Sequence, residues 1–278
     1  FTLRGDRVYS GQSGTNGAYT VSGAETASYV LTPSKSDEIK AITAFDASLV
    51  LQHDAGLITL TGPAALAADV NKSGSITSFD AFFILQKAVD LITVPFPGAG
   101  VVWDFTPGTR SYSNLSSHQT GQDFTAILLG DVSGNWPGTS QAPSQSGGQI
   151  ASGGSVVNTP VMVALRERAS SGPEERKVWL LVKAPRPVVY SIDLTLRYDA
   201  DRGGVKWIQA GPLAAASALA ARTNEPGVMR LALSGAVPLG EVGAFLVLGL
   251  PEGGALNSKI VDVLINEGTV PVQIDATG

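Results

Sequence analysis

Residues 42–59 read ITAFDASLVLQHDAGLIT, and residues 76–93 repeat this pattern as ITSFDAFFILQKAVDLIT. At the offset of 34 positions, ten of the eighteen residues are identical. Apolar residues recur three and four positions apart in both copies, which is the period of one helix face. Asp46 and Asp80 stand near the start of each copy, where a carboxylate stabilises a helix N-terminus. The repeat therefore predicts two paired helices.

The stretch that leads into the second copy has the spacing of a calcium loop. Residues 69–80 read DVNKSGSITSFD. An EF-hand-type loop binds calcium through oxygens at positions 1, 3, 5, 7 and 12, with a glycine at position 6. The matching donors here are Asp69, Asn71, Ser73, the carbonyl of Ser75, and Asp80. We expect a Ca²⁺ site at these residues, and an ion-free polar turn is the alternative.

The loop and its helix, DVNKSGSITSFDAFFILQKAVDLI, resemble the type I dockerin repeat, in which a calcium loop runs directly into a single helix. Dockerins carry two such repeats, and the resemblance covers about residues 35–93. The two repeats would be residues 35–59 and 69–93. The resemblance implies calcium binding and a protein partner.

The first repeat departs from the dockerin pattern. At the same offset, Lys35, Asp37, Ile39 and Lys40 stand where Asp, Asn, Ser and Gly are expected. The missing half of a loop occurs later, as GDVSGNW at residues 130–136. We therefore predict a split second site in which Asp131, Ser133 and Asn135 lie close to Asp46. A polar turn that only caps the front half is the alternative.

A linker divides the chain into two halves. Residues 137–154 read PGTSQAPSQSGGQIASGG, a composition that cannot bury a core and is typical of flexible linkers. We expect a front domain over 1–136, which contains the helix pair, and a back domain over 155–278.

The back half is predicted to be all-β. Short apolar runs such as MVALRE, VWLLVKA and GAFLVLGL alternate with turn residues. The runs SVVNTPVMVALRE, YSIDLTLRYDA and VMRLALSG resemble the strands of a cohesin module over about residues 155–275. The resemblance implies a β-sandwich of jelly-roll or immunoglobulin-like type, and another immunoglobulin-like or fibronectin-like sandwich is the alternative. The alanine-rich residues 213–221 predict a short helix or a helical loop.

The front half also carries strand patterns, at residues 18–22 and 28–32. The stretch from GTNGAYTVSG to ASYVLTPSK resembles part of a carboxypeptidase-regulatory-like β domain. The fold class we expect is thus mainly β and multidomain: an N-terminal β domain with an embedded two-helix calcium module, a linker, and a C-terminal cohesin-like sandwich.

Composition excludes several functions. A net charge of −5 offers no basic field for nucleic acid, and no apolar run reaches the length of a membrane span. The chain has no cysteine and only two histidines, His53 and His118, neither of which lies near a GxSxG motif. We therefore expect no enzyme activity. Four aromatic residues could form a sugar platform, although a core role is favoured for Trp103, Phe105, Tyr112 and Trp136.

These features together predict a secreted, calcium-binding structural or adhesion protein of a bacterial or archaeal cell surface. Phe1 is not an initiator methionine, so we expect an export signal to have been removed. One chain carries both halves of a cohesin–dockerin pair, which predicts head-to-tail association of copies into an open polymer. The alternating tail at residues 268–275 could donate a strand to a neighbour. The alternatives are a scaffold that binds another protein or a surface glycan, and a fragment of a secreted carbohydrate-active enzyme.

Overall fold

The structure is a computed structural model of the 278-residue chain. It describes residues 1–36, 40–136, 160–169, 176–184, 189–202, 204–250 and 259–275. The predicted linker at 137–154, and Asp37 and Ile39 of the first repeat, lie outside these residues. Within the described part of the chain, no helix is long and apolar enough to cross a membrane.

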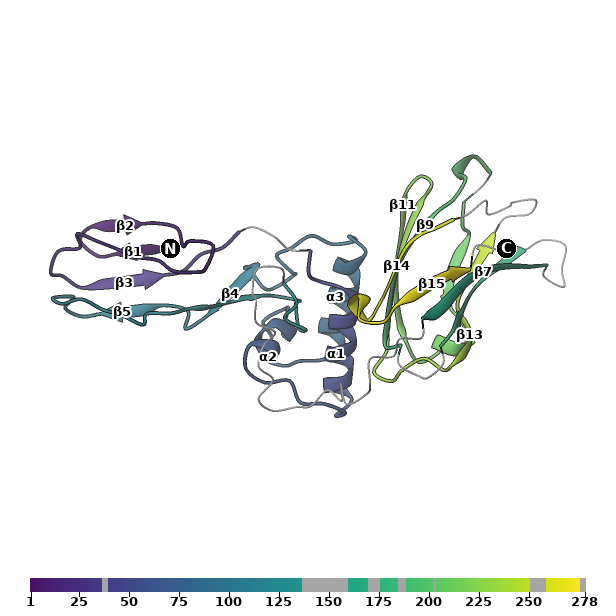
Figure 1. The fold of residues 1–278 in the computed structure, drawn as a ribbon, viewed down its shortest axis with the longest axis horizontal. Helices are drawn as coiled ribbons and strands as arrows, with labels where there is room; N and C mark the ends of the chain where they lie inside the picture. The colour runs from purple at the N-terminus through teal and green to yellow at the C-terminus, as the bar shows by residue number, and fades with distance from the viewer. Residues whose placement is uncertain are drawn as a thin grey trace.

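The molecule is elongated, with three bodies in a row (Figure 1). At the N-terminal end lies an antiparallel sheet of order β2-β1-β3-β5, formed by β1 (Thr2–Arg4), β2 (Val8–Ser10), β3 (Tyr29–Thr32) and β5 (Arg110–Tyr112). Leu3, Tyr29 and Leu31 form a small buried core on this sheet. The predicted strand at 28–32 is therefore present as β3, whereas residues 18–22 form no strand.

The middle body contains three helices and a hairpin. The helices are α1 (Ala44–Asp54), α2 (Gly62–Ala68) and α3 (Ser78–Ala88), and the hairpin pairs β4 (Trp103–Thr106) with β6 (Thr125–Leu128). α1 and α3 are the two predicted repeat helices, and they pack against each other. The short α2 between them was not predicted; Pro63 in its first turn suits a helix start.

The two repeat helices begin in the same way. Asp46 accepts the backbone N–H of Thr43 at 2.8 Å, and Asp80 accepts that of Thr77 at 3.0 Å. Each Thr–Asp pair is a capping box, an arrangement whose cap contributes about 1 kcal/mol to a helix. Both aspartates are fully buried, because they also bond the loops described below.

The C-terminal body is a β-sandwich. One sheet has the order β10-β13-β8-β7-β15 and the other the order β11-β12-β9-β14. The first sheet comprises β7 (Val161–Ala169), β8 (Arg176–Lys183), β10 (Trp207–Ala210), β13 (Val242–Leu250) and β15 (Val272–Asp275). The second comprises β9 (Ser191–Arg197), β11 (Ala218–Glu225), β12 (Val228–Ser234) and β14 (Lys259–Ile265). A core of aliphatic side chains with Phe245 fills the space between them. The chain is thus mainly β, as predicted.

Two segments of the back half differ from the prediction. The helix or helical loop expected at 213–221 is limited to a single 3₁₀ turn, Pro212–Ala214, and the rest of the segment enters strand β11. The tail strand β15 pairs in parallel with β7 of its own sheet, so the structure does not leave it free to donate to a neighbour.

Candidate docking interface and calcium loops

The loop between α2 and α3 folds around its own oxygen atoms. The carboxylate of Asp69 accepts the backbone N–H groups of Ser73 at 3.0 Å and Gly74 at 2.9 Å, and the Asn71 side chain accepts the Ser73 N–H at 2.8 Å. The Ser73 hydroxyl donates to the Ser75 carbonyl at 3.1 Å. Gly74 has φ 87°, which permits the sharp turn at this position. The five predicted donors thus lie in one contiguous loop.

The loop is closed at its far end by Asp80 and held from outside by Lys72. Asp80 accepts the N–H of Asn71 at 3.4 Å, in addition to its bond to Thr77. Burial raises the pKa of Asp80, while its hydrogen bonds act against that shift. Lys72 forms an ion pair of 2.6 Å with Asp104 on β4, which attaches the loop to the hairpin.

The predicted split site has the same hydrogen-bonding pattern, divided between distant segments. Asp131 accepts the N–H groups of Gly134 at 2.9 Å, Asn135 at 3.1 Å and Trp136 at 3.2 Å. Asp46 accepts the N–H of Ser133, two residues after Asp131, at 2.9 Å. The first loop has the equivalent bond from Asn71, two residues after Asp69, to Asp80. The structure therefore brings residues 131–135 against the start of α1.

The diverged first repeat has a different role. Lys35, which stands where a ligand is expected, places its ammonium 4.9 Å from the ring centroid of Trp103 and 4.2 Å from that of Trp136. These are cation–π distances, so this lysine covers aromatic rings instead of binding a metal. Residues 131–136 take the position that the first repeat leaves unfilled.

The donor set at both loops fits a hard cation. The available atoms are carboxylate, amide, hydroxyl and carbonyl oxygens, which calcium prefers. Among the described residues, no group of three or more His, Cys, Asp or Glu side chains is arranged to hold a metal ion. At the first loop only Asp69 and Asp80 are charged, and the remaining donors are neutral. Such a site suits calcium at low affinity, and it does not suit a softer metal that needs nitrogen or sulfur.

A glutamate from the sandwich adds negative charge next to the split site. Glu267 lies in the turn Asn266–Gly268 after β14, and its carboxylate Oε1 accepts the hydroxyls of Thr43 at 2.7 Å and Ser133 at 3.1 Å. Burial, followed by the nearby charges of Glu267 and Asp131, raises the pKa of Asp46 well above its usual value. Burial likewise raises the pKa values of Asp131 and Glu267. The carboxyl groups of Asp46, Asp131 and Glu267 thus lie near one another in a poorly solvated region, although within the described part of the chain these three side chains do not surround a common metal position.

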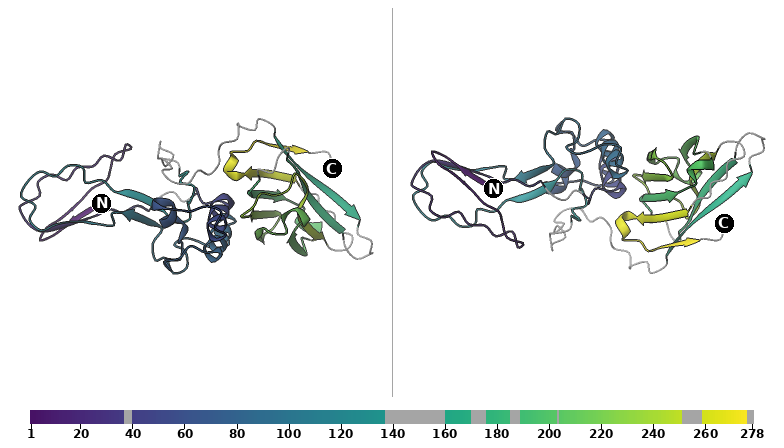
Figure 2. Two further views of the ribbon diagram at one scale, coloured as in Figure 1. Left: turned by 90° about the horizontal axis from the view of Figure 1, so that it is seen from below. Right: turned by 90° about the horizontal axis from the view of Figure 1, so that it is seen from above.

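The sheet β11-β12-β9-β14 turns one face toward the helices (Figure 2). Ala232 of β12 lies opposite Asp193 of β9 on one side and Ala220 of β11 on the other, so the three share this face. Ala220 and Ala232 belong to the same buried cluster as the apolar residues of α1 and α3. Small side chains at the centre of the face allow the helices to approach closely.

Helix α1 packs against strands β9 and β12 of this face. Ala44, Ser48 and Gln52 recur four positions apart, so they share one side of the helix, and all three are buried. The backbone N–H of Ala44 donates to both carboxylate oxygens of Asp193, at 3.1 and 3.2 Å. Burial, together with the charges of Glu267 and Asp262, raises the pKa of Asp193 to about 7.

The other end of the interface is an exposed charge cluster. Asp90, just after α3, pairs with Arg230 of β12 at 3.0 Å and with Arg222 of β11 at 3.8 Å. The three side chains are 43%, 42% and 26% exposed, so water screens these pairs. Each contributes little to docking, because exposed ion pairs are generally worth below about 1 kcal/mol.

Glu267 and Asp193 were not predicted as site residues. Both lie in the sandwich, far along the chain from the residues they contact. Asp193 occupies a regular polar position in its strand, between the apolar Ile192 and Leu194. Neither residue therefore carries a local sequence signal of its role.

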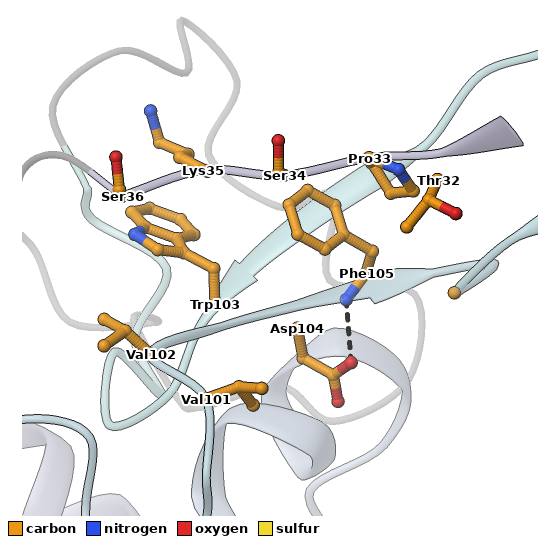
Figure 3. Close-up of a pocket in the computed structure, with 11 residues that line it drawn as sticks. Thr32, Pro33, Ser34, Lys35, Ser36, Val101, Val102, Trp103, Asp104 and Phe105 are labelled. Carbon is orange, nitrogen blue, oxygen red and sulfur yellow. Dashed lines mark hydrogen bonds between the residues drawn. The ribbon is translucent and has the colours of Figure 1, made fainter. Parts of the chain in front are cut away.

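The aromatic residues considered for sugar binding are divided between two sites. Trp103 is buried and meets Trp136 edge to face, with ring centroids 5.3 Å apart. Trp103 and Phe105 line one side of a groove of about 450 Å³, with residues 32–36 above them (Figure 3). Tyr112 lies on β5 in the N-terminal sheet, where its hydroxyl donates to Gln122 at 2.9 Å. The four rings therefore form no common platform.

His53 has a structural contact. Its Nδ1 accepts the backbone N–H of Leu60 at 3.2 Å, which fastens the segment that follows α1. His118 is exposed in a loop between β5 and β6.

The chain matches no established protein-family profile and no curated protein sequence. Solved structures similar to it are cohesin modules. A non-cellulosomal cohesin from the archaeon Archaeoglobus fulgidus has 14% identity and a TM-score of 0.34, covering 42% of this chain and 85% of that one. The sixth cohesin of scaffoldin B from Acetivibrio cellulolyticus, solved with a dockerin, has 12% identity and a TM-score of 0.34, covering 42% and 95%.

A third similar structure is the cohesin module of a family 33 glycoside hydrolase from Clostridium perfringens. It has 13% identity and a TM-score of 0.33, covering 42% of this chain and 98% of that one. Because all these TM-scores are below 0.5, they assign neither family nor function to the chain. The functional argument therefore rests on the contacts described above.

Proposed function

We propose that this chain is a calcium-binding structural protein that assembles by docking its helix pair onto its sandwich, in the manner of a cohesin–dockerin pair. One observation carries the proposal: α1 and α3 cover the sheet face of β9, β11 and β12 and bury Ala220 and Ala232. Buried apolar contact flanked by polar bonds is the composition of a specific protein interface.

The same docking surfaces can be used within one chain or between chains. In the structure the two surfaces contact each other within one chain, so both are covered in the monomer. If the helix pair of one copy occupies the sheet of the next, each copy has one unused surface of each kind. Such a heterologous contact continues into a head-to-tail polymer unless the rotation closes a ring.

Calcium would strengthen either arrangement. Asp46 and Thr43 belong both to the split site and to the docked end of α1. A cation held by Asp46, Asp131 and neighbouring oxygens would neutralise carboxyl groups that repel each other. Few formal charges place the affinity near the weak end, with Kd about 10⁻⁴–10⁻³ M, which is the range of extracellular modules. This supports a secreted or cell-surface location, where calcium is abundant enough to fill such sites.

Thiol labelling tests the docking directly, because the chain has no cysteine of its own. Ala232→Cys places a single thiol under the helices, Ala200→Cys provides an exposed reference, and Ala214→Cys a reference in the sandwich core. We expect Ala232→Cys to react far more slowly than Ala200→Cys. If the two react equally fast in calcium, the docked interface does not exist in solution.

Light scattering separates the closed monomer from the polymer. We expect the mass of the full chain to rise with protein concentration in calcium and to fall in EDTA. A strictly monomeric chain at high concentration in calcium, with Ala232→Cys still protected, would show docking within the chain and would rule out the polymer.

A further inference from the structure

The turn at residues 266–268 has an unusual backbone. Asn266, Glu267 and Gly268 have φ angles of 46°, 59° and 79°, so three successive residues are left-handed. Glycine and asparagine tolerate this conformation, but glutamate rarely adopts it. Residue 267 is therefore a glutamate at a position where the backbone favours glycine, which indicates that its side chain has a function.

Asn266 holds this turn in place from inside the sandwich. Its side-chain oxygen accepts the backbone N–H groups of Tyr190 at 2.9 Å and Ser191 at 3.1 Å, at the start of β9. The Asn266 carbonyl accepts the N–H and the hydroxyl of Thr269 at 3.1 and 2.7 Å. The turn is thus fixed to the strand that carries Asp193, and Glu267 projects from it in a set direction.

Among the hydrogen bonds described above, those of the Glu267 side chain go only to residues outside the sandwich. Its partners are the hydroxyls of Thr43 and Ser133, which lie 224 and 134 positions away in the chain. Thr43 is the N-cap of α1, and Ser133 belongs to the segment that completes the split site. The carboxylate therefore contacts two segments that are adjacent only when the front half is fully folded.

Resting on the docking function proposed above, we infer that Glu267 is the specificity-determining residue of the sandwich surface. It recognises the N-cap hydroxyl of a helix, Thr43, together with the hydroxyl of Ser133 from the loop segment beside it, and Asp193 accepts the adjacent N–H of Ala44. The partner that fits is the front half of this chain, in the same copy or in a second copy. Ala220 and Ala232 at the centre of the sheet face allow close contact but do not distinguish one partner from another. The ion pairs of Asp90 are screened by solvent and contribute little to the free energy of docking.

The test measures labelling of Ala232→Cys in the full chain, with Glu267→Gly as the main variant. Glycine suits the left-handed backbone, so we expect this variant to keep the sandwich folded while it deletes the whole glutamate side chain. We expect Ala232→Cys labelling to accelerate about tenfold or more, as for the loss of a hydrogen bond to a charged group. Labelling of Ala214→Cys should stay the same or slow. Glu225→Ala, an exposed glutamate on β11, is the matched control and should change neither rate.

A second variant checks the pairing itself. Thr43→Val removes one hydroxyl, and in the double variant with Glu267→Gly the acceleration should be smaller than the product of the two single effects. Glu267→Gln keeps an acceptor oxygen and should accelerate labelling less than Glu267→Gly.

The outcomes distinguish this inference from the proposed function. If Ala232→Cys is protected and Glu267→Gly leaves it protected, docking stands and the role of Glu267 is refuted. If both thiols accelerate equally, or if the two single effects multiply, Glu267 only stabilises the sandwich and the inference is again refuted. If Ala232→Cys is unprotected in the parent chain, the docking function itself fails.

Discussion

Removal of the Asp131 side chain should cancel about half of the stabilisation that calcium gives to the front half. Asp131→Ala deletes a carboxylate that organises three backbone N–H groups and supplies a charge to the split site. In EDTA the loss of three hydrogen bonds is offset only in part by the relief of repulsion on Asp46, so the effect of calcium is taken for each variant as the difference between the two conditions. In calcium, the variant loses the binding energy of one site.

The magnitude follows from mass action. For a Kd of about 10⁻⁴ M and about 10 mM calcium, one site stabilises the folded state by about 2.7 kcal/mol. For a folding unit of roughly 60–100 residues, about 1 kcal/mol shifts the melting temperature by about 4–8 °C. Each calcium site should therefore raise the melting temperature by about 10–20 °C.

Scanning calorimetry in calcium and in EDTA measures this difference. We expect Asp69→Ala to abolish the other half of the calcium effect, and the double variant to show almost none. Asp123→Ala removes an exposed aspartate near β6 and should respond to calcium like the parent chain. If calcium raises the melting temperature of Asp131→Ala as much as that of the parent, the split site holds no ion.

Three further predictions concern the docked interface. First, the pKa of Asp193 is raised to about 7 by burial, so its docked form binds a proton more tightly than the undocked form. Docking in EDTA should therefore be strongest below pH 4–5 and weaken as the pH rises through about 7, and a calorimetric pH series should show this. Asp193→Asn should reduce this dependence without abolishing it, because the pKa values of Asp46 and Glu267 are also raised. Second, Arg230→Ala should change docking by less than about 1 kcal/mol, since its pair with Asp90 is exposed, and thiol labelling of Ala232→Cys would reveal a larger effect. Third, Ala220→Trp should open the interface by overpacking, at a cost of about 1–3 kcal/mol, visible as a larger radius in small-angle scattering with an unchanged sandwich melt.

Features with a local cause could be predicted from the sequence. The two repeat helices begin where a threonine and an aspartate three residues later form a capping box, and this signal needs no tertiary contact. The loop at 69–80 likewise has all of its donors within twelve residues. The strands of the sandwich follow from alternating apolar residues, which gave the mainly β character of the back half.

Strand β11 shows how tertiary packing overrides local preference. Its alanines favour a helix in isolation, and a short helix or helical loop was the prediction. In the folded chain this segment lies at the edge of a sheet that faces α3, and Ala220 is buried there because a small side chain allows close packing. Pairing with β12 along the strand outweighs the small helix preference of each alanine.

The sequence alone determined which residues could supply oxygens to a cation, and the repeat pattern predicted that the segment at 131–135 is half of a loop that lies close to Asp46. Only the tertiary structure decided that Glu267 and Asp193 of the sandwich reach the same end of α1. These two residues are more than a hundred positions from their partners and belong to no repeat, so they leave no periodic or spacing signal. They meet because the sheet face and the helix pair bury apolar surface against each other. That burial depends on the packed helices and sheet and not on any short segment of the sequence.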